Sequence, residues 1–127
     1  MANPNIAAAT NIYGNTSYLI PSTTGATAWT ALTPASLTVN RVNNIVASNT
    51  TSSAVNVTLS INSAASGGGT AYRIAYQISV PPNASLVLVD KTTAIYVGDA
   101  QSIVATVGTA SSPVEFTASY EAITGTA

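Results

Sequence analysis

The sequence feature that most constrains the fold is an alternation of large apolar residues with other side chains between Tyr72 and Val80. A period of two places successive side chains on opposite faces of a β-strand, so this pattern predicts a strand with one buried face. Pro81 and Pro82 follow directly. Because proline lacks the N–H that a β-ladder needs and fixes its own φ, we expect the strand to end there. The residues predicted to face inward are Tyr72, Ile74, Tyr76, Ile78 and Val80.

Two shorter strands are predicted after the prolines. Leu86–Val89 is apolar at every position, which is typical of a short strand inside a core. Asp90 and Lys91 then turn the chain into a further strand at Ala94–Val97, and Gly98-Asp99 turns it again.

Similar patterns occur on both sides of this stretch. Leu37–Asn49 predicts a long strand whose apolar phase changes, which a β-bulge near Arg41–Asn43 would reconcile. Val55–Asn62 alternates cleanly, and together the two runs predict an antiparallel hairpin. The remaining predicted strands are Ser17–Ile20, Ile103–Val107 and Val114–Tyr120.

These strands, separated by polar turns and with no 3.6-residue period, predict an all-β fold. We expect an antiparallel β-sandwich, jelly-roll or immunoglobulin-like, of about eight short strands. The length of 127 residues fits one domain. Residues 1–15 have no usable period and are predicted to form an extended N-terminal arm, which leaves residues 16–127 as the single sandwich domain.

Three aromatic or glycine-rich features have structural interpretations that we prefer to functional ones. Trp29, the only tryptophan, is predicted to plug the core rather than to serve as a ligand platform. Tyr72, Tyr76 and Tyr120 lie at the inward phase of their strands. The run Gly67-Gly68-Gly69 is predicted to be a flexible hairpin tip rather than a phosphate loop, because a strand follows it and no Lys-Ser/Thr does.

Charge is scarce, and this limits the possible partners. Only 6% of the residues are charged, three basic and four acidic, against about 25% in ordinary soluble domains. Too few cations are present to neutralise several phosphates, so we expect no nucleic-acid partner. No run approaches the roughly 18 apolar residues of a membrane helix, so no membrane partner is expected, and the N-terminal residues do not resemble a signal peptide.

A surface built from Ser, Thr, Asn and Gln is cheaper to desolvate than one built from ions, and a net charge of −1 adds little repulsion between copies. These properties favour a protein that packs against copies of itself or other neutral proteins. The alternative is a secreted domain with an ordinary neutral surface.

Residues suited to catalysis are almost absent. Without His or Cys, no Ser-His-Asp or Cys-His arrangement and no usual zinc site can form. Glu115 and Glu121 are separated by roughly 20 Å along one strand, too far to act as a carboxylate pair. Asp90 and Asp99 are predicted to cap turns, although with loop carbonyls they could form a weak calcium site. We therefore expect no enzyme, and no catalytic, cofactor-binding or metal-binding residues.

One part of the sequence resembles a known family. The run Tyr72–Asp99, which contains the pattern I-x-V-P-x-N-x-S-L-V-L-V-D-K at Ile78–Lys91 and the later run Ile95–Asp99, resembles the small all-β virion proteins of tailed bacteriophages, in particular those of marine cyanophages and their relatives. Asn40–Asn49 and the ending Ser119–Ile123 fit the same pattern. The resemblance covers about the last two-thirds of the chain and includes no active-site residue.

The resemblance implies a non-enzymatic structural protein in the virion, assembled in the host cytoplasm. A capsid decoration or cement subunit is the first expectation, which would stabilise the head through contacts with the major capsid protein or other virion proteins and form a homo-oligomer. A neck, tail or baseplate subunit is the first alternative. The second is a carbohydrate-binding or adhesion module that uses Trp29 or exposed tyrosines as stacking surfaces.

Overall fold

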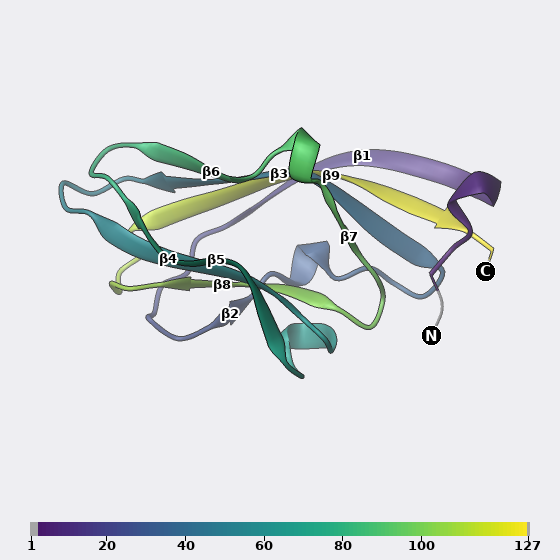
Figure 1. Ribbon diagram of the computed structural model, residues 1–127, viewed down its shortest axis with the longest axis horizontal. Helices are drawn as coiled ribbons and strands as arrows, with labels where there is room; N and C mark the ends of the chain where they lie inside the picture. Colours follow the sequence, from purple (N-terminus) through teal and green to yellow (C-terminus); the bar gives the residue numbers. More distant parts are fainter. Residues whose placement is uncertain (1–2, 127) are drawn as a thin grey trace.

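Two facing antiparallel sheets account for most of the chain in the computed structural model, which describes residues 3–126 (Figure 1). Sheet A contains, in spatial order, β1 (Ala9–Leu19), β9 (Val114–Gly125), β3 (Thr38–Asn49) and β6 (Ser85–Val89), with β7 (Ile95–Val97) also paired to β3. Sheet B contains β2 (Thr27–Ala28), β8 (Ser102–Val107), β4 (Val55–Asn62) and β5 (Ala71–Val80). Short 3₁₀ turns lie at η1 (Ile6–Ala8), η2 (Thr30–Leu32), η3 (Ala65–Gly67) and η4 (Lys91–Thr93).

The strands pair in reverse order along the chain. β4 pairs with β5, β3 with β6 and β7, β2 with β8, and β1 with β9, all antiparallel. The chain is therefore one long antiparallel ribbon whose successive pairs belong alternately to the two sheets. This is the strand order of a jelly roll. The predicted all-β antiparallel sandwich is confirmed, and the strand order is the jelly-roll one of the two alternatives.

The core lies between the sheets and is built around two aromatic rings. Trp29 is 1% exposed, and its ring meets Phe116 edge to face with 6.4 Å between the ring centroids. Its indole N–H donates to the Ser17 hydroxyl at 3.0 Å, which satisfies the polar atom of a buried side chain. The prediction that Trp29 is a core residue is confirmed.

The hairpin predicted for Leu37–Asn49 and Val55–Asn62 is wrong, because β3 belongs to sheet A and β4 to sheet B. Both strands turn apolar side chains toward the same core from opposite sides. Alternation shows that a strand has one buried face, but it does not show which strand lies beside it. The predicted bulge is confirmed, since the pairing of β3 with β9 shifts register between Val42 and Asn44.

The inward orientation predicted for the tyrosines of β5 is also wrong. Tyr72 is 61% exposed and Tyr76 is exposed as well, whereas Val80 is buried. The pairing of β5 with β4 shifts register twice, and Gln77 has a left-handed φ of 48°, so the strand changes phase along its length. Tyr120 is half-buried, and its hydroxyl donates to the Ala31 carbonyl at 3.4 Å.

Leu86–Val89 was predicted as a core strand, yet β6 lies at an edge of sheet A. Val89 is buried there, but Val87 is 57% exposed on the outer face. An unbroken apolar run does not distinguish a strand covered on both faces from an edge strand that presents apolar side chains to a partner.

The predicted boundary between an arm at residues 1–15 and the domain falls inside β1. From Ala9 to Leu19 the chain is a single strand paired along β9. Its residues are nearly all exposed on both faces, so no alternation marks it in the sequence. Residues 3–8 precede it, and the Asn5 N–H donates to the Thr126 carbonyl. Residues 1 and 2 lie outside the described part of the chain.

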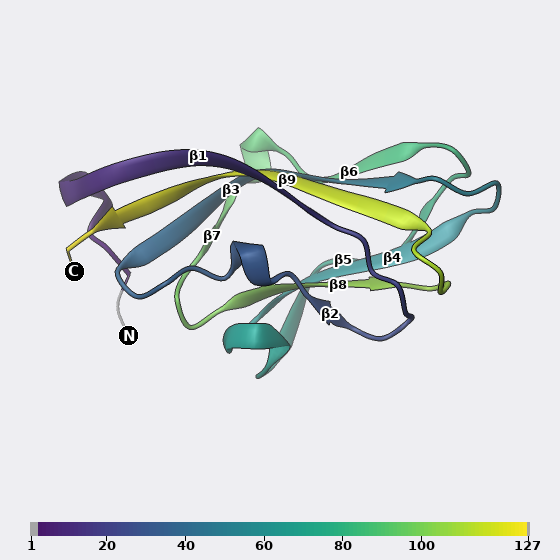
Figure 2. The ribbon, with the colours of Figure 1, turned by 180° about the vertical axis from the view of Figure 1, so that it is seen from behind.

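The glycine-rich loop is not a free tip. Figures 1 and 2 both show η3, in teal, against the side of sheet B that faces away from sheet A. The Gly67 N–H donates to the Ser102 hydroxyl at 2.9 Å, that hydroxyl donates to the Ala64 carbonyl, and the Asn62 amide donates to the Gly67 carbonyl. The loop thereby covers Val104 on the outer face of sheet B, which explains why that side chain is buried.

This loop generates a prediction about glycine. Gly69 has a φ of +70°, and a Cβ there would collide with the Ser63 hydroxyl and approach the Ala64 nitrogen to 2.9 Å. Gly69→Ala should therefore destabilise the fold by about 1–3 kcal/mol, measured by urea unfolding with Trp29 fluorescence. Gly14→Ala is the matched control, because a Cβ at Gly14 meets nothing within 4 Å. It should change stability by less than about 0.5 kcal/mol, and equal effects would contradict the packed loop.

Candidate interaction surface

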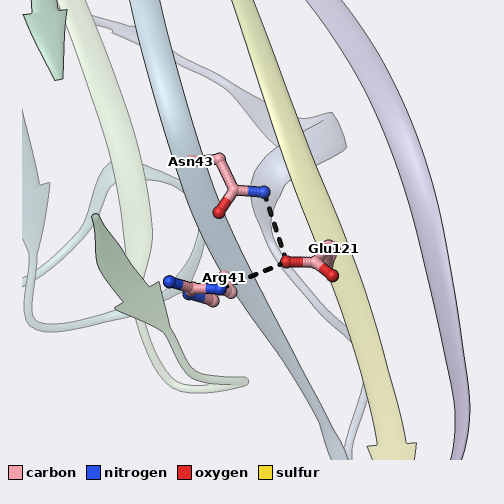
Figure 3. Close-up of polar contacts among 3 residues, drawn as sticks. All are labelled: Arg41, Asn43 and Glu121. Atoms are coloured by element: carbon pink, nitrogen blue, oxygen red, sulfur yellow. Dashed lines mark hydrogen bonds and ion pairs between the residues drawn. The ribbon is translucent and has the colours of Figure 1, made fainter. Parts of the chain in front are cut away.

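The strongest charged contact lies on sheet A and holds two strands together. Arg41 on β3 and Glu121 on β9 are paired in register, with 3.5 Å between Nη1 and Oε1 (Figure 3). The amide of Asn43, brought there by the bulge in β3, donates to the same oxygen at 3.3 Å. Both charged side chains are about one-third exposed, so the ion pair contributes less than about 1 kcal/mol. Its geometry is that of a cross-strand clamp.

Asp90 has the turn-capping role that its position predicts. Its carboxylate accepts hydrogen bonds from the backbone N–H groups of Thr92 and Thr93 and thereby caps the turn η4, which begins at Lys91. A further hydrogen bond from the Thr92 hydroxyl is the largest of the effects that lower the pKa of Asp90.

Asp99 lies in the turn between β7 and β8, but a different residue caps this turn. The Gly98 N–H donates to the side-chain oxygen of Gln101 at 2.9 Å. Asp99 instead lines a polar depression of about 310 Å³ together with Asn3 and Gln101. Turn position alone could not distinguish the capping residue from its neighbour.

The acidic side chains are dispersed over the molecule. Among residues 3–126, no three acidic side chains come close enough to hold a metal ion. Glu115 lies opposite Ser48, whereas Glu121 lies opposite Arg41 further along the same strand pair. The described residues also include no helix long and apolar enough to cross a membrane.

The outer face of sheet A carries a row of three largely apolar side chains and one threonine that crosses four strands. The register places Tyr18 of β1 opposite Thr117 of β9, Thr117 opposite Val46 of β3, and Val46 opposite Val87 of β6. We call these four residues the outer row. Tyr18 is 74% exposed and Val87 57%. Exposed apolar side chains aligned across a sheet are typical of a protein contact surface.

A shallow depression adjoins one end of the outer row. It has a volume of about 320 Å³ and is lined by Tyr18, Ile20, Glu115 and Thr117, mostly with apolar atoms. Glu115 is the one charged residue of this lining. Covering the depression would remove apolar surface from water, and a favourable partner would leave Glu115 hydrated or pair it with a cation.

A second exposed aromatic area lies on β5, on the other sheet. Tyr72 and Tyr76 are both exposed, and the Arg73 guanidinium lies 5.2 Å from the centre of the Tyr76 ring. The sequence pattern assigned both tyrosines to the inner face. The two register shifts that turn them outward leave no local sequence signal.

A polar depression of about 270 Å³ lies on the outer face of sheet B. It is lined mainly by hydroxyl and amide side chains, together with backbone at the end of β8. No aromatic ring contributes to it, so it lacks a stacking platform for a sugar. The lining includes Thr24, Asn56, Thr58, Gln77 and Thr106.

The cap at Asp90 predicts a pH dependence. Since the folded-state pKa is lowered, the carboxylate stabilises the fold above its ordinary pKa of about 4, and this contribution is lost as the pH falls through the folded-state pKa. Asp90→Asn should lower the melting temperature at pH 7, and the gap to the wild-type chain should close on acidification. Thermal unfolding between about pH 2 and pH 7 would show this. A gap that is constant with pH would contradict the role of the charge.

Comparisons with known proteins give one structural similarity. No protein-family model matches the sequence, and no curated protein matches it significantly. A chain in the structure of infectious bursal disease virus, Gx strain, is similar with a TM-score of 0.32 and 13% identity. The alignment covers 93% of this chain and 39% of the viral chain, so this chain spans well under half the length of the other. The function proposed below therefore rests on the residues and topology of this chain.

Proposed function

We propose that this chain is a non-enzymatic structural subunit of a virus particle, which acts through protein–protein contacts made by the outer face of sheet A. The outer row is the observation that carries the proposal. It places exposed apolar side chains of β1 and β6 on one face, connected by Thr117 and Val46 across the sheet. An apolar face of this kind on a small domain is best explained by a partner that covers it.

The composition supports assembly as the role. Seven charged residues in 127 leave a surface of hydroxyl, amide and apolar groups, which costs little to desolvate. The jelly roll is a fold that viral capsid domains use, although lectin domains and cupins use it too. Fold alone does not imply function. The proposal is therefore supported mainly by the outer row and by the scarcity of charge.

The finer assignment is a decoration or cement subunit on the head of a tailed phage, in contact with the major capsid protein and located in the virion after assembly in the host cytoplasm. The resemblance of Ile78–Lys91 and Ile95–Asp99 to small phage virion proteins supports this choice. A place in the neck, tail or baseplate would use the same outer face against a different virion protein.

A binding role without catalysis is supported by the separation of the carboxylates. Asp90 is engaged in a turn cap and Glu121 in a cross-strand clamp, so two of the four acidic residues have structural partners. The carbohydrate-binding alternative loses its main support, because Trp29 is buried between the sheets. Its remaining support is the exposed pair Tyr72 and Tyr76.

Binding to virion parts tests the proposal. Purified chain should co-sediment with empty capsid shells from a phage whose genome carries this sequence. Val87→Lys places a charge in the outer row at an exposed position, so it should leave folding intact and weaken binding at least tenfold, which corresponds to about 1.4 kcal/mol. Tyr72→Ser, on the other sheet, is the matched control and should bind normally.

Other outcomes of this experiment are equally informative. Binding to isolated tails but not to shells would move the subunit to the neck or tail. Binding to neither, together with absence of the chain from purified virions by mass spectrometry, would overturn the virion assignment. Retention on immobilised glycans that is lost in Tyr72→Ser would favour the carbohydrate-binding alternative.

A further inference from the structure

We infer that the free edge of β1 is a pairing site for β1 of a second copy of this chain, so that sheet A continues from one copy into the other. The inference deepens the self-association that belongs to the proposed function, but it needs no virion component. It rests on a comparison of the sheet edges. The β1 edge has fewer features that prevent pairing with another strand than the other edges have.

Exposed strand edges present unpaired N–H and C=O groups, and proteins usually protect them with charges, prolines, bulges or shortness. β5, the edge of sheet B, carries Arg73 and shifts register twice against β4. The opposite edge of sheet B is β2, only two residues long. At the far edge of sheet A, β6 has five residues between Pro82 and Asp90, and β7 has three. Each of these edges is protected or too short to template a long ladder.

β1 is longer than β2, β6 and β7 and more regular than β5. It runs for 11 residues along the border of sheet A (Figure 1) and contains no charged residue and no proline. Its pairing with β9 is regular from Asn11 to Leu19, with a single irregularity at the Ala9 end. About half of its backbone N–H and C=O groups point away from β9, as in any edge strand. A long, regular and uncharged edge is the form that accepts another strand.

A strand from within the same molecule does not fill this position. All nine strands in residues 3–126 already have partners in the two sheets. The ends of the described chain are also engaged, because Asn5 is bonded to Thr126 next to the last strand. The edge is therefore available to a separate chain.

A second copy fits the edge because β1 is compatible with itself. Two antiparallel copies bring no charges together, since the strand carries none. Ile12, Tyr13 and Tyr18 are exposed on β1 and would supply cross-strand apolar contacts. Gly14 lies at the middle of the strand, and a Cβ there meets nothing within 4 Å.

This pairing also connects the two proposals physically. An antiparallel pair of identical edge strands is related by a two-fold axis perpendicular to the sheet, so the outer faces of both copies lie on the same side. Tyr18 belongs both to β1 and to the outer row. A dimer would therefore present two outer rows to the same partner surface, and two linked weak contacts bind more tightly than one.

Charge placed at the centre of β1 tests the inference. Asn15 is exposed and lies beside Gly14, so Asn15→Lys and Asn15→Glu should each fold normally. With the two-fold axis at Gly14, the two copies of residue 15 are diagonal neighbours on one face of the sheet, so like charges would repel in each variant. Sedimentation velocity should show a dimer for the wild-type chain and at least a tenfold weaker dimer for each variant. An equal mixture of the two variants should recover the dimer, because opposite charges then meet.

The matched control is Ser79→Lys, which adds the same charge to the exposed edge strand β5 and should leave the dimer unchanged. Amide hydrogen exchange at the β1 N–H groups that point away from β9 should be slow in the wild-type chain and fast in Asn15→Lys. A monomeric wild-type chain at high concentration, or a dimer that survives Asn15→Lys and breaks with Ser79→Lys, would overturn the inference. A wild-type monomer that binds shells would remove only this inference, whereas a dimer that binds no virion part would remove only the virion assignment.

Discussion

The structure depends on one buried residue, Trp29, that is bonded to both sheets. The backbone N–H of Trp29 donates to the Ile103 carbonyl of sheet B, and its indole N–H donates to Ser17 of sheet A. Its ring meets Phe116, also of sheet A, edge to face. In a chain with no cysteine and few ion pairs, apolar burial of this kind must supply most of the cohesion between the layers.

Buried neutral side chains, rather than ion pairs, form the polar contacts that connect loops and strands in the interior. The Asn49 amide donates to the carbonyls of Ser53 and Val80, which ties the crossover between sheets to the end of β5. The Asn40 amide donates to the Leu32 carbonyl and anchors η2 in the interior. Such neutral groups are cheaper to bury than ions when each finds a partner. The scarcity of charge is therefore compatible with buried polar side chains that are hydrogen-bonded.

The sequence was sufficient to predict the all-β fold class and the bulge in β3. It was insufficient to predict which strands pair with each other. Alternation identified most strands, and the phase change near Val42 correctly predicted a bulge, because burial and pleat leave a direct trace in the residue pattern. The false hairpin of β3 and β4 and the inward tyrosines of β5 share a cause. The fold of the whole antiparallel ribbon determines which strands pair. It also determines where the register of an edge strand shifts. The outer row could not be predicted for the same reason, since it depends on the registers of three strand pairs.

The edge strands of the two sheets differ in how well they are protected against pairing with another chain, and this difference bears on self-association. Selection against aggregation acts on every exposed edge, so an edge that is long, regular and uncharged is hard to explain in a chain that never pairs there. At β5 the same chain uses Arg73 and two bulges, which shows that protective features are compatible with this fold. Their absence from residues 11–19 of β1 therefore points to a specific requirement of that edge, and a two-fold partner would meet it while keeping both apolar faces directed to one side.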